Sequence, residues 1–264
     1  MEFLGYIASA FIGISLGLIG GGGSILTVPV IVYLFGVQPL LATSYSLFIV
    51  GSTSLIGAVN NARSGQINVR AALFFGASSA LTVFLTRKYL VPRIPHDIIE
   101  IGNYILTAPV LTMLLFGILM LLASISMILG KNSAPTEKEC SDCIRFFKLL
   151  AYGVSIGLVT AFLGAGGGFL LIPALIFLIK LPVKKAIGTS LLIISINSLI
   201  GFTGDLGHFQ IDWKFLLTLT IIASVGIFIG GVINKRINGE KLKKGFGWFV
   251  LIMGIYIIGR EVLK

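Results

Sequence analysis

The sequence predicts an all-α integral membrane protein built from two homologous halves. Two observations support this prediction: the composition, and a glycine-rich segment that occurs twice. The chain has 264 residues, of which 56% are hydrophobic and 11% charged, and its mean hydropathy is +1.03. Asp, Glu, Lys and Arg are absent from residues 3–62, 101–130, 149–179 and 186–204. Because a charge in hydrocarbon costs about 3 kcal/mol or more, stretches of this length indicate membrane-spanning segments.

The duplicated segments are Gly20–Pro29 and Gly164–Pro173, and Pro173 lies 144 residues after Pro29. The same offset aligns further matches, which are Ile12-Gly13 with Ile156-Gly157, Ala42 with Ala186, Ser46-Leu47 with Ser190-Leu191, Ser54-Leu55-Ile56-Gly57 with Ser198-Leu199-Ile200-Gly201, and Gln66-Ile67 with Gln210-Ile211. A single ungapped offset over this length indicates an internal duplication. In a membrane protein, interrupted hydrophobic segments at matching places in two halves point to a transport site.

Each half is predicted to contain a hairpin broken by glycine and three transmembrane helices. An unbroken helix over residues 3–35 would be about 50 Å long against a ~30 Å hydrocarbon core, and each glycine at 20–23 disfavours helix by about 1 kcal/mol. The predicted segments are 3–19, 24–35, 40–62, 71–86 and 101–129, then 149–163, 169–179, 186–203, 215–233 and 246–259. The predicted domains are a first repeat at 1–130, a polar linker loop at 131–148 and a second repeat at 149–264.

The charges of the loops separate two topologies. If each glycine-interrupted segment crossed once, 11 Lys/Arg would lie inside and nine outside, which is nearly no bias. If each glycine region reverses the chain, 14 of the 20 Lys/Arg lie inside, in loops 63–70, 131–148, 180–185 and 234–244. The positive-inside rule favours the second topology, with both termini outside. Its odd number of segments per half predicts inverted repeats.

The glycine turns are the first candidate site. Non-helical backbone is tolerated at membrane depth only where protein buries it or where it lines a polar cavity. Each turn leaves the next helix with free N–H groups and a positive dipole end, a geometry that binds anions. Close helix packing through small residues is the alternative explanation. The predicted substrate-binding residues of the turns are Gly22, Gly23, Ser24, Gly166, Gly167 and Gly168.

Polar residues inside apolar segments form the second candidate set. Neutral hydroxyl and amide groups can hold an anion without a full buried counter-charge. The alternative is interhelical hydrogen bonding, which contributes about 0.6 to 2 kcal/mol for each bond. The duplication aligns Ser46 with Ser190 and Thr53 with Asn197, which favours a shared role. The predicted substrate-binding residues of this set are Ser46, Asn60, Thr189, Ser190 and Asn197.

Ionisable residues near the segment ends form the third set. Asp205 and His208 are candidates for proton coupling, because histidine titrates near neutral pH; a solvated loop turn is the favoured alternative. Arg63 is included as a substrate-binding residue that attracts an anion at a vestibule, with anchoring at lipid headgroups as an equal alternative. Cys140 and Cys143 supply only two of the four ligands that a zinc site needs, so inert thiols of the linker loop are favoured. We expect no catalytic residue, metal or cofactor.

The net charge of +10 does not indicate a nucleic-acid partner. The Lys and Arg residues lie in short loops between apolar segments, where topology and anionic headgroups explain them. No basic stretch interleaved with aromatic residues forms a binding face. The expected partners are a small anion and the lipid bilayer, and a homo-oligomer remains open.

The motifs resemble those of the TauE/SafE family of sulfite and organosulfonate exporters. The resemblance rests on Gly20–Pro29 with Gly164–Pro173, on Ala42–Leu47 with Ala186–Leu191, and on the Gly65-Gln66-Ile67 turn, and it covers nearly the whole chain. It implies a secondary transporter of small sulfur-containing or organic anions in the bacterial cytoplasmic membrane, working in export. A proton-coupled anion importer is the alternative, and an integral-membrane thiol or redox enzyme is a weaker one. The Cys140/Cys143 loop is not an element of the family pattern.

Overall fold

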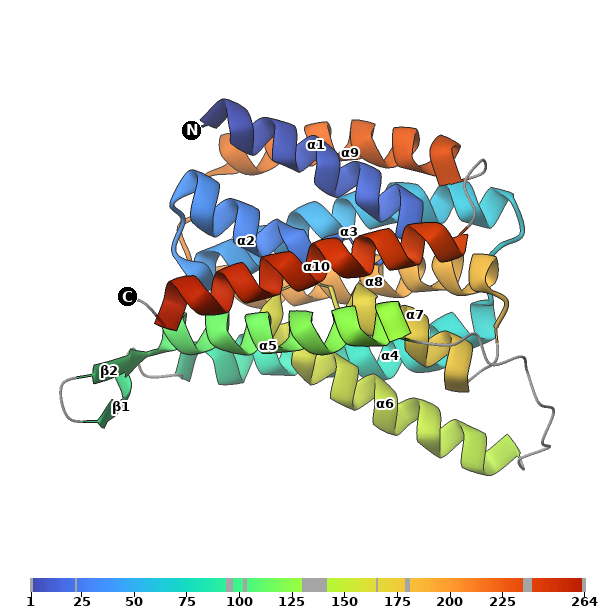
Figure 1. Ribbon diagram of the computed structural model, residues 1–264. Helices are drawn as coiled ribbons and strands as arrows, with labels where there is room; N and C mark the ends of the chain where they lie inside the picture. The colour runs from blue at the N-terminus through green and yellow to red at the C-terminus, as the bar shows by residue number, and fades with distance from the viewer. Residues whose placement is uncertain are drawn as a thin grey trace.

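The computed structural model describes residues 2–21, 23–93, 97–101, 104–129, 142–164, 166–178, 181–234 and 239–262. Helices dominate these residues, as the composition predicts (Figure 1). In chain order the helices are α1 (Glu2–Ile19), α2 (Ser24–Phe35), α3 (Pro39–Arg63), α4 (Val69–Leu85), α5 (Ala108–Leu129), α6 (Asp142–Leu163), α7 (Gly168–Leu178), α8 (Val183–Asp205), α9 (Trp213–Asn234) and α10 (Gly239–Val262).

The described part of each half contains five helices, and each predicted segment coincides with one of them. The all-α membrane fold class is therefore confirmed. The short helices explain the hairpins, because α2 has 12 residues and α7 has 11. At 1.5 Å per residue they are about 18 Å and 16 Å long, too short to cross a ~30 Å hydrocarbon core. Both begin at the glycine turns in the interior of the bundle.

Four predicted boundaries are wrong, and one of them is the start of α10, which begins at Gly239 and not at residue 246. The segment predicted from Ile101 begins as a helix only at α5, because an antiparallel hairpin of β1 (Asp97–Ile101) and β2 (Tyr104–Thr107) precedes it. The helix predicted to end at Thr86 continues from α4 through a π-helical turn (η1, Thr86–Leu90) and a 3-10 turn (η2, Val91–Arg93). Helix α6 begins inside the polar linker, so Cys143 lies in its first turn, whereas Cys140 lies outside the described residues.

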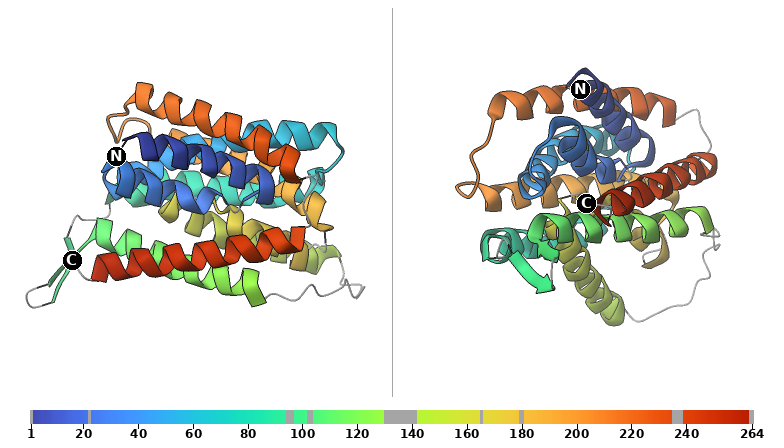
Figure 2. Two further views of the ribbon diagram at one scale, coloured as in Figure 1. Left: turned by 45° about the horizontal axis from the view of Figure 1, so that its top comes forward. Right: turned by 60° about the vertical axis from the view of Figure 1, so that its left-hand side comes forward.

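The helix contacts repeat when the two halves are exchanged. Helix α1 packs on α9, and its counterpart α6 packs on α4. Helix α3 contacts α9 as α8 contacts α4, while α3 with α8 and α5 with α10 form the contacts between counterparts. In Figures 1 and 2 both chain termini lie at the end of the bundle that carries the β-hairpin. Because α3 and α8 contact each other and each also contacts a helix of the opposite half, these two helices form the centre of the molecule.

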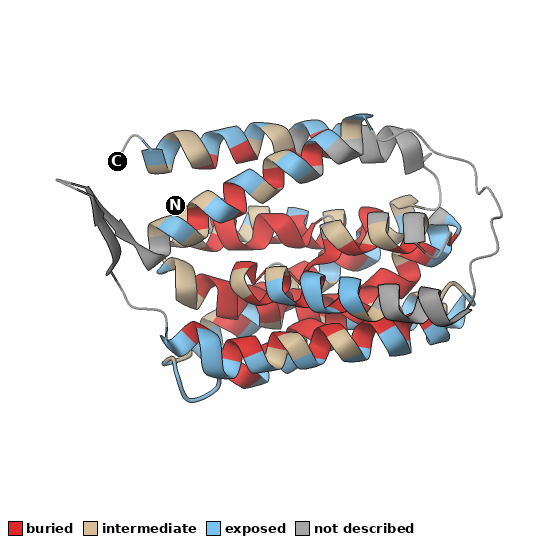
Figure 3. Cartoon of the chain, turned by 90° about the horizontal axis from the view of Figure 1, so that it is seen from below, coloured by how far each residue is buried: buried red, intermediate tan, exposed pale blue. Residues whose placement is uncertain are grey.

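Burial distinguishes this centre from the surface. Buried residues concentrate on the inner helices, and the outer helices expose much of their surface (Figure 3). The exposed surface is itself apolar, as Ile221 and Phe228 on α9 and Ile252 on α10 are 64%, 58% and 63% exposed. Among the described residues, four helices are long and apolar enough to span a membrane on their own. A surface of this kind suits lipid as its solvent.

Candidate functional site

The two glycine turns begin with the same local structure and then diverge, since Gly23 has φ −66° and its counterpart Gly167 has φ +66°. Gly20 donates its N–H to the carbonyl of Leu16 at 2.8 Å, and Gly164 donates to Thr160 at 2.9 Å. Gly20 has φ +81° and Gly164 has φ +66°, a left-handed conformation that favours glycine. Helices α1 and α6 therefore end in the same way inside the bundle, and the chain reverses direction there.

The two turns meet each other backbone to backbone. A Cβ atom built on Gly21 would lie 2.3 Å from the Cα of Gly168, and one built on Gly168 would lie 2.4 Å from the Cα of Gly21. Since Gly168 is the first residue of α7 and Gly21 precedes α2 by three residues, the N-terminal ends of both short helices converge at this contact. Their dipoles make the junction electropositive.

Helices α3 and α8 enclose this junction from opposite directions. The side-chain position of Gly20 faces Ile187 and the hydroxyl of Ser190 on α8, while that of Gly164 faces Thr43, which the repeat aligns with Ile187, on α3. The two helices run antiparallel, because the hydroxyl of Ser44 near the start of α3 donates to Asp205 at the end of α8. The first glycine of each turn therefore packs against the other half.

Buried hydroxyl groups without partners among the described residues lie on α1, α2, α3, α6 and α8, and three of them face the turns. Buried side-chain oxygens with no hydrogen-bond partner among the described residues belong to Ser15, Thr27, Ser46, Ser54, Thr160 and Ser198. Three of them face turn glycines, since their oxygens would lie 2.1 to 2.8 Å from a Cβ built on Gly23, Gly167 or Gly166. Membrane hydroxyls commonly bond to a backbone carbonyl one turn away, as Ser190 does to Ile187 at 2.8 Å. An unpartnered buried hydroxyl needs another explanation, and a ligand supplies one.

The structure brings several of the predicted residues together at the junction. Gly23 precedes α2 as an N-cap without a side-chain bond, and the buried hydroxyl of Ser24 donates to the carbonyl of Gly21 at 2.7 Å. Gly166, Gly167 and Gly168 are buried there as well, whereas Gly22 lies outside the described residues.

Asn197 is fully buried beside the junction. Its Oδ1 accepts from Ser79 of α4 at 2.9 Å, and its Nδ2 has no partner among the described residues. Thr189 accepts the N–H of Asn68 at 2.9 Å, nearer the end of the bundle. Asn60 and Arg63 are exposed in the last turn of α3, away from the junction.

Asp205 lies at the opposite end from Arg63, and the solvated loop turn favoured for it is wrong. Asp205 is the last residue of α8 and is 1% exposed. Its Oδ2 accepts from Nη1 of Arg87 at 2.9 Å and from the hydroxyl of Ser44. Arg87 lies in η1 and is fully buried, while His208 is exposed in the following loop. A buried ion pair of this kind is uncommon inside a membrane protein.

The comparisons with known proteins agree with this architecture. The profile of the family "Sulfite exporter TauE/SafE" matches residues 6–257. The chain belongs to the TauE/SafE family. It is 32% identical over 258 residues to a probable membrane transporter protein of Xylella fastidiosa (strain 9a5c), which covers 96% of this chain and 94% of the relative. It is 27% identical to the probable membrane transporter protein YunE of Bacillus subtilis (strain 168), which covers 98% and 95%. No solved structure matches the chain significantly.

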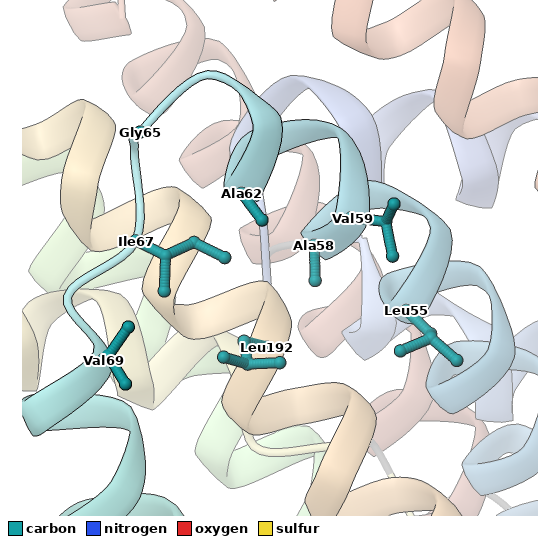
Figure 4. Close-up of a pocket in the computed structure, with 8 residues that line it drawn as sticks. All are labelled: Leu55, Ala58, Val59, Ala62, Gly65, Ile67, Val69 and Leu192. Carbon is teal, nitrogen blue, oxygen red and sulfur yellow. The ribbon is translucent and has the colours of Figure 1, made fainter.

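Membership of the TauE/SafE family makes the chain a multi-pass membrane transporter and not an enzyme. A lipid environment and a small-molecule substrate follow from this. Two surface hollows among the described residues differ in their lining: one of about 320 Å³ includes Arg260 and Glu261, and the other is apolar. The apolar hollow of about 260 Å³, shown in Figure 4, has only apolar side chains and a glycine along its wall and opens beside lipid-facing residues of α3. Its lining residues are Leu55, Ala58, Val59, Ala62, Gly65, Ile67, Val69 and Leu192.

Sequence reasoning missed two features of the site. Ser54 and Ser198 are aligned by the repeat, and both are buried without a partner among the described residues, so their match in sequence could have identified them. Arg87 directly follows the predicted segment 71–86, so the sequence places it in a loop. The spacing of four residues places Ser79, Val83 and Arg87 on one helical face, which suggests that the helix continues to Arg87. The structure shows that this face contacts α8 at Ser79.

Proposed function

We propose that this TauE/SafE protein is a secondary transporter that exports small sulfur-containing or organic anions, of the sulfite and sulfonate class, across the cytoplasmic inner membrane. The observation that carries the proposal is the junction of the two glycine turns. There, two helix N-termini converge among buried hydroxyls that lack partners. Free N–H groups, a positive dipole end and neutral hydroxyl donors together suit an oxyanion.

The charge of the lining favours an anion over a cation. The residues described at the junction are glycines, hydroxyl-bearing side chains and aliphatic side chains, with no acidic group among them, and Asp205 is already paired with Arg87. An ammonium group would therefore lack a counter-charge, whereas an oxyanion would find several donors. The hydroxyls are also fully buried, since Ser46, Ser54 and Ser198 have no exposed surface. Transport requires that the two halves move apart at one end and then at the other.

We infer that the halves are inverted repeats with both termini outside. The antiparallel course of α3 and α8 and the exchange pattern of helix contacts support this arrangement. The excess of Lys and Arg at the loops of the opposite end supports the orientation. We expect that an impermeant thiol reagent applied to intact cells leaves Cys140 unlabelled and labels it after permeabilisation. Labelling of Cys140 in intact cells would contradict the orientation.

Proton-coupled import is the second candidate. The burial of Asp205, three residues before the exposed His208, favours it, because a buried carboxylate near a histidine suits a proton relay. In this alternative the anion uses the same junction, and only the direction and the coupling ion differ. Substitution of Asp205 or His208 would then flatten the pH dependence of the flux.

The test is flux in proteoliposomes loaded with radiolabelled sulfite, sulfoacetate or thiosulfate, with and without an imposed pH gradient. We expect saturable flux of at least one of these anions and none in liposomes that contain Gly166→Leu protein. Small cations and neutral analogues serve as controls for the sign of the substrate. Flux of a cation, with no measurable flux of any of the three oxyanions, would overturn the proposal.

A further inference from the structure

The buried cluster of Arg87, Asp205 and Ser44 contains hydrogen-bond donors that have no acceptor among the described residues. One carboxylate oxygen, Oδ2 of Asp205, accepts both from Nη1 of Arg87 at 2.9 Å and from the hydroxyl of Ser44. The guanidinium of Arg87 carries five N–H donors. Its Nε and Nη2 have no hydrogen-bond partner among the described residues, although Arg87 has no exposed surface. A buried charged group therefore keeps most of its donors unused.

The unused donors lie on one edge of the guanidinium. Nε and Nη2 together form the side-on edge, which binds two oxygens of a carboxylate, sulfonate or phosphate in parallel hydrogen bonds. Asp205 occupies Nη1 alone and leaves this edge open. Because an unsatisfied buried donor is costly, an edge of this geometry needs a function or a ligand.

The equivalent place in the other half lacks the charged groups. The repeat aligns Asp205 with Asn61, Ser44 with Gly188, and Arg87 with Gly231. There the backbone fills the space, since a Cβ built on Gly188 would lie 2.3 Å from the carbonyl oxygen of Gln66. The α3–α8 contact thus forms without an ion pair at that end, so packing alone does not explain the ion pair at this end.

We propose that the open edge of Arg87 is an oxyanion-binding subsite at one end of the transport path, the end where both termini lie. This proposal rests on the proposed function and adds a second binding position for the same class of substrate. Asp205 holds the guanidinium in place and offsets part of its charge, which weakens the hold on the anion enough for release. Ser44 fixes the carboxylate in turn. Of the two equivalent places at the ends of the α3–α8 contact, only this one carries a buried cation among the described residues, so the two ends are not equivalent for an anion.

The experiment measures binding of radiolabelled sulfite to the full-length protein in lipid nanodiscs, together with the midpoint of thermal unfolding. Asp205→Asn keeps hydrogen-bond acceptors for Arg87 and Ser44 but removes the negative charge. We expect it to bind sulfite about tenfold more tightly while unfolding at a lower temperature, because the like charge beside the anion is gone. Arg87→Lys keeps the charge but loses the side-on edge, and we expect binding about tenfold weaker.

Two further variants complete the design. Arg87→Gln with Asp205→Asn removes both charges, so it leaves no uncompensated ion, and we expect weak binding in a folded protein. Lys88→Gln changes an exposed cation of the same turn and should bind sulfite within about twofold of the wild type. The opposite response of affinity and stability in Asp205→Asn separates a binding role from a structural one.

The outcomes distinguish this subsite from the function proposed above. A purely structural ion pair predicts that Asp205→Asn lowers affinity and stability together, and that result overturns the subsite. Unchanged sulfite binding in Arg87→Lys, or in the double variant if Arg87→Lys does not fold, also overturns it and leaves anion transport standing. A wild-type protein that binds none of sulfite, sulfoacetate and thiosulfate overturns both.

Discussion

At the centre of the bundle, Gly20 and Gly164 have the same left-handed backbone and the same hydrogen bond to the residue four positions before. At the two ends of the α3–α8 contact, the halves differ. One end buries an ion pair between Arg87 and Asp205, and the other packs the backbone of Gly188 against Asn61. The duplication has thus kept the way in which α1 and α6 end at the centre, and it has changed the chemistry at the ends of the α3–α8 contact.

This difference has a physical basis. The contact between the two turns leaves no room for a side chain on either, because a Cβ at Gly21 or Gly168 would lie within 2.4 Å of the opposite backbone. A change in one turn therefore damages both halves at once. Either end of the α3–α8 contact tolerates different residues, since this contact forms with an ion pair at one end and without one at the other. Binding of an anion by backbone groups can therefore be shared by both halves, while a charged side chain that selects the anion belongs to one end.

The largest effect is expected for a side chain placed in the centre. Gly166→Leu forces a leucine into a backbone conformation with φ +65°, and its Cβ would lie 2.8 Å from the hydroxyl of Ser198. We therefore expect this variant to abolish flux in proteoliposomes. The equivalent Gly22→Leu should do the same. Gly36→Leu is the matched control, because Gly36 has a similar φ of +69° and nothing within 4 Å. Comparable loss in Gly36→Leu would assign the effect to backbone strain instead.

A smaller but still large effect should distinguish the two ends. Asp205→Ala leaves the charge of Arg87 buried and unpaired, which we expect to destabilise the protein by about 3–5 kcal/mol. Asn61→Ala, at the equivalent place, loses a hydrogen bond from Nδ2 to the carbonyl of Gly57 and should cost about 1 kcal/mol. Unfolding of both variants in detergent, followed by tryptophan fluorescence, gives the comparison. Equal losses would mean that the ion pair is screened by water.

A third test asks whether the centre is equivalent in both halves. Ser54→Ala and Ser198→Ala each remove a buried hydroxyl that has no partner among the described residues. Stability should stay constant or rise slightly in both, because an unsatisfied polar group is lost. Anion affinity measured by calorimetry should fall by about 1 kcal/mol in each if both hydroxyls contact the substrate. A loss in only one variant would show that the anion lies nearer one half.

The contrast between centre and ends also explains what the sequence could predict. The repeated glycines in apolar segments are sufficient to predict the ten helices and the two interior turns. The length of an uncharged segment and the unfavourable free energy of glycine in a helix are both local properties of the sequence. The repeat could not show that Gly21 touches Gly168, since this contact depends on how the halves dock. The sequence also favoured a solvated loop turn for Asp205, because its partner Arg87 is 118 residues away in the chain and directly follows a predicted helix.

The smallest effect is expected for the linker between the halves. Cys143 lies in the first turn of α6, and Cys140 precedes this helix in the predicted linker, outside the duplicated segments. The double variant Cys140→Ser with Cys143→Ser should therefore transport within about twofold of the wild type, since substitutions away from functional contacts have small effects. Flux of sulfite in proteoliposomes, with the metal content of the purified wild type measured in parallel, checks this. A large loss of flux or a stoichiometric metal would give the linker a regulatory role that neither the centre nor the ends require.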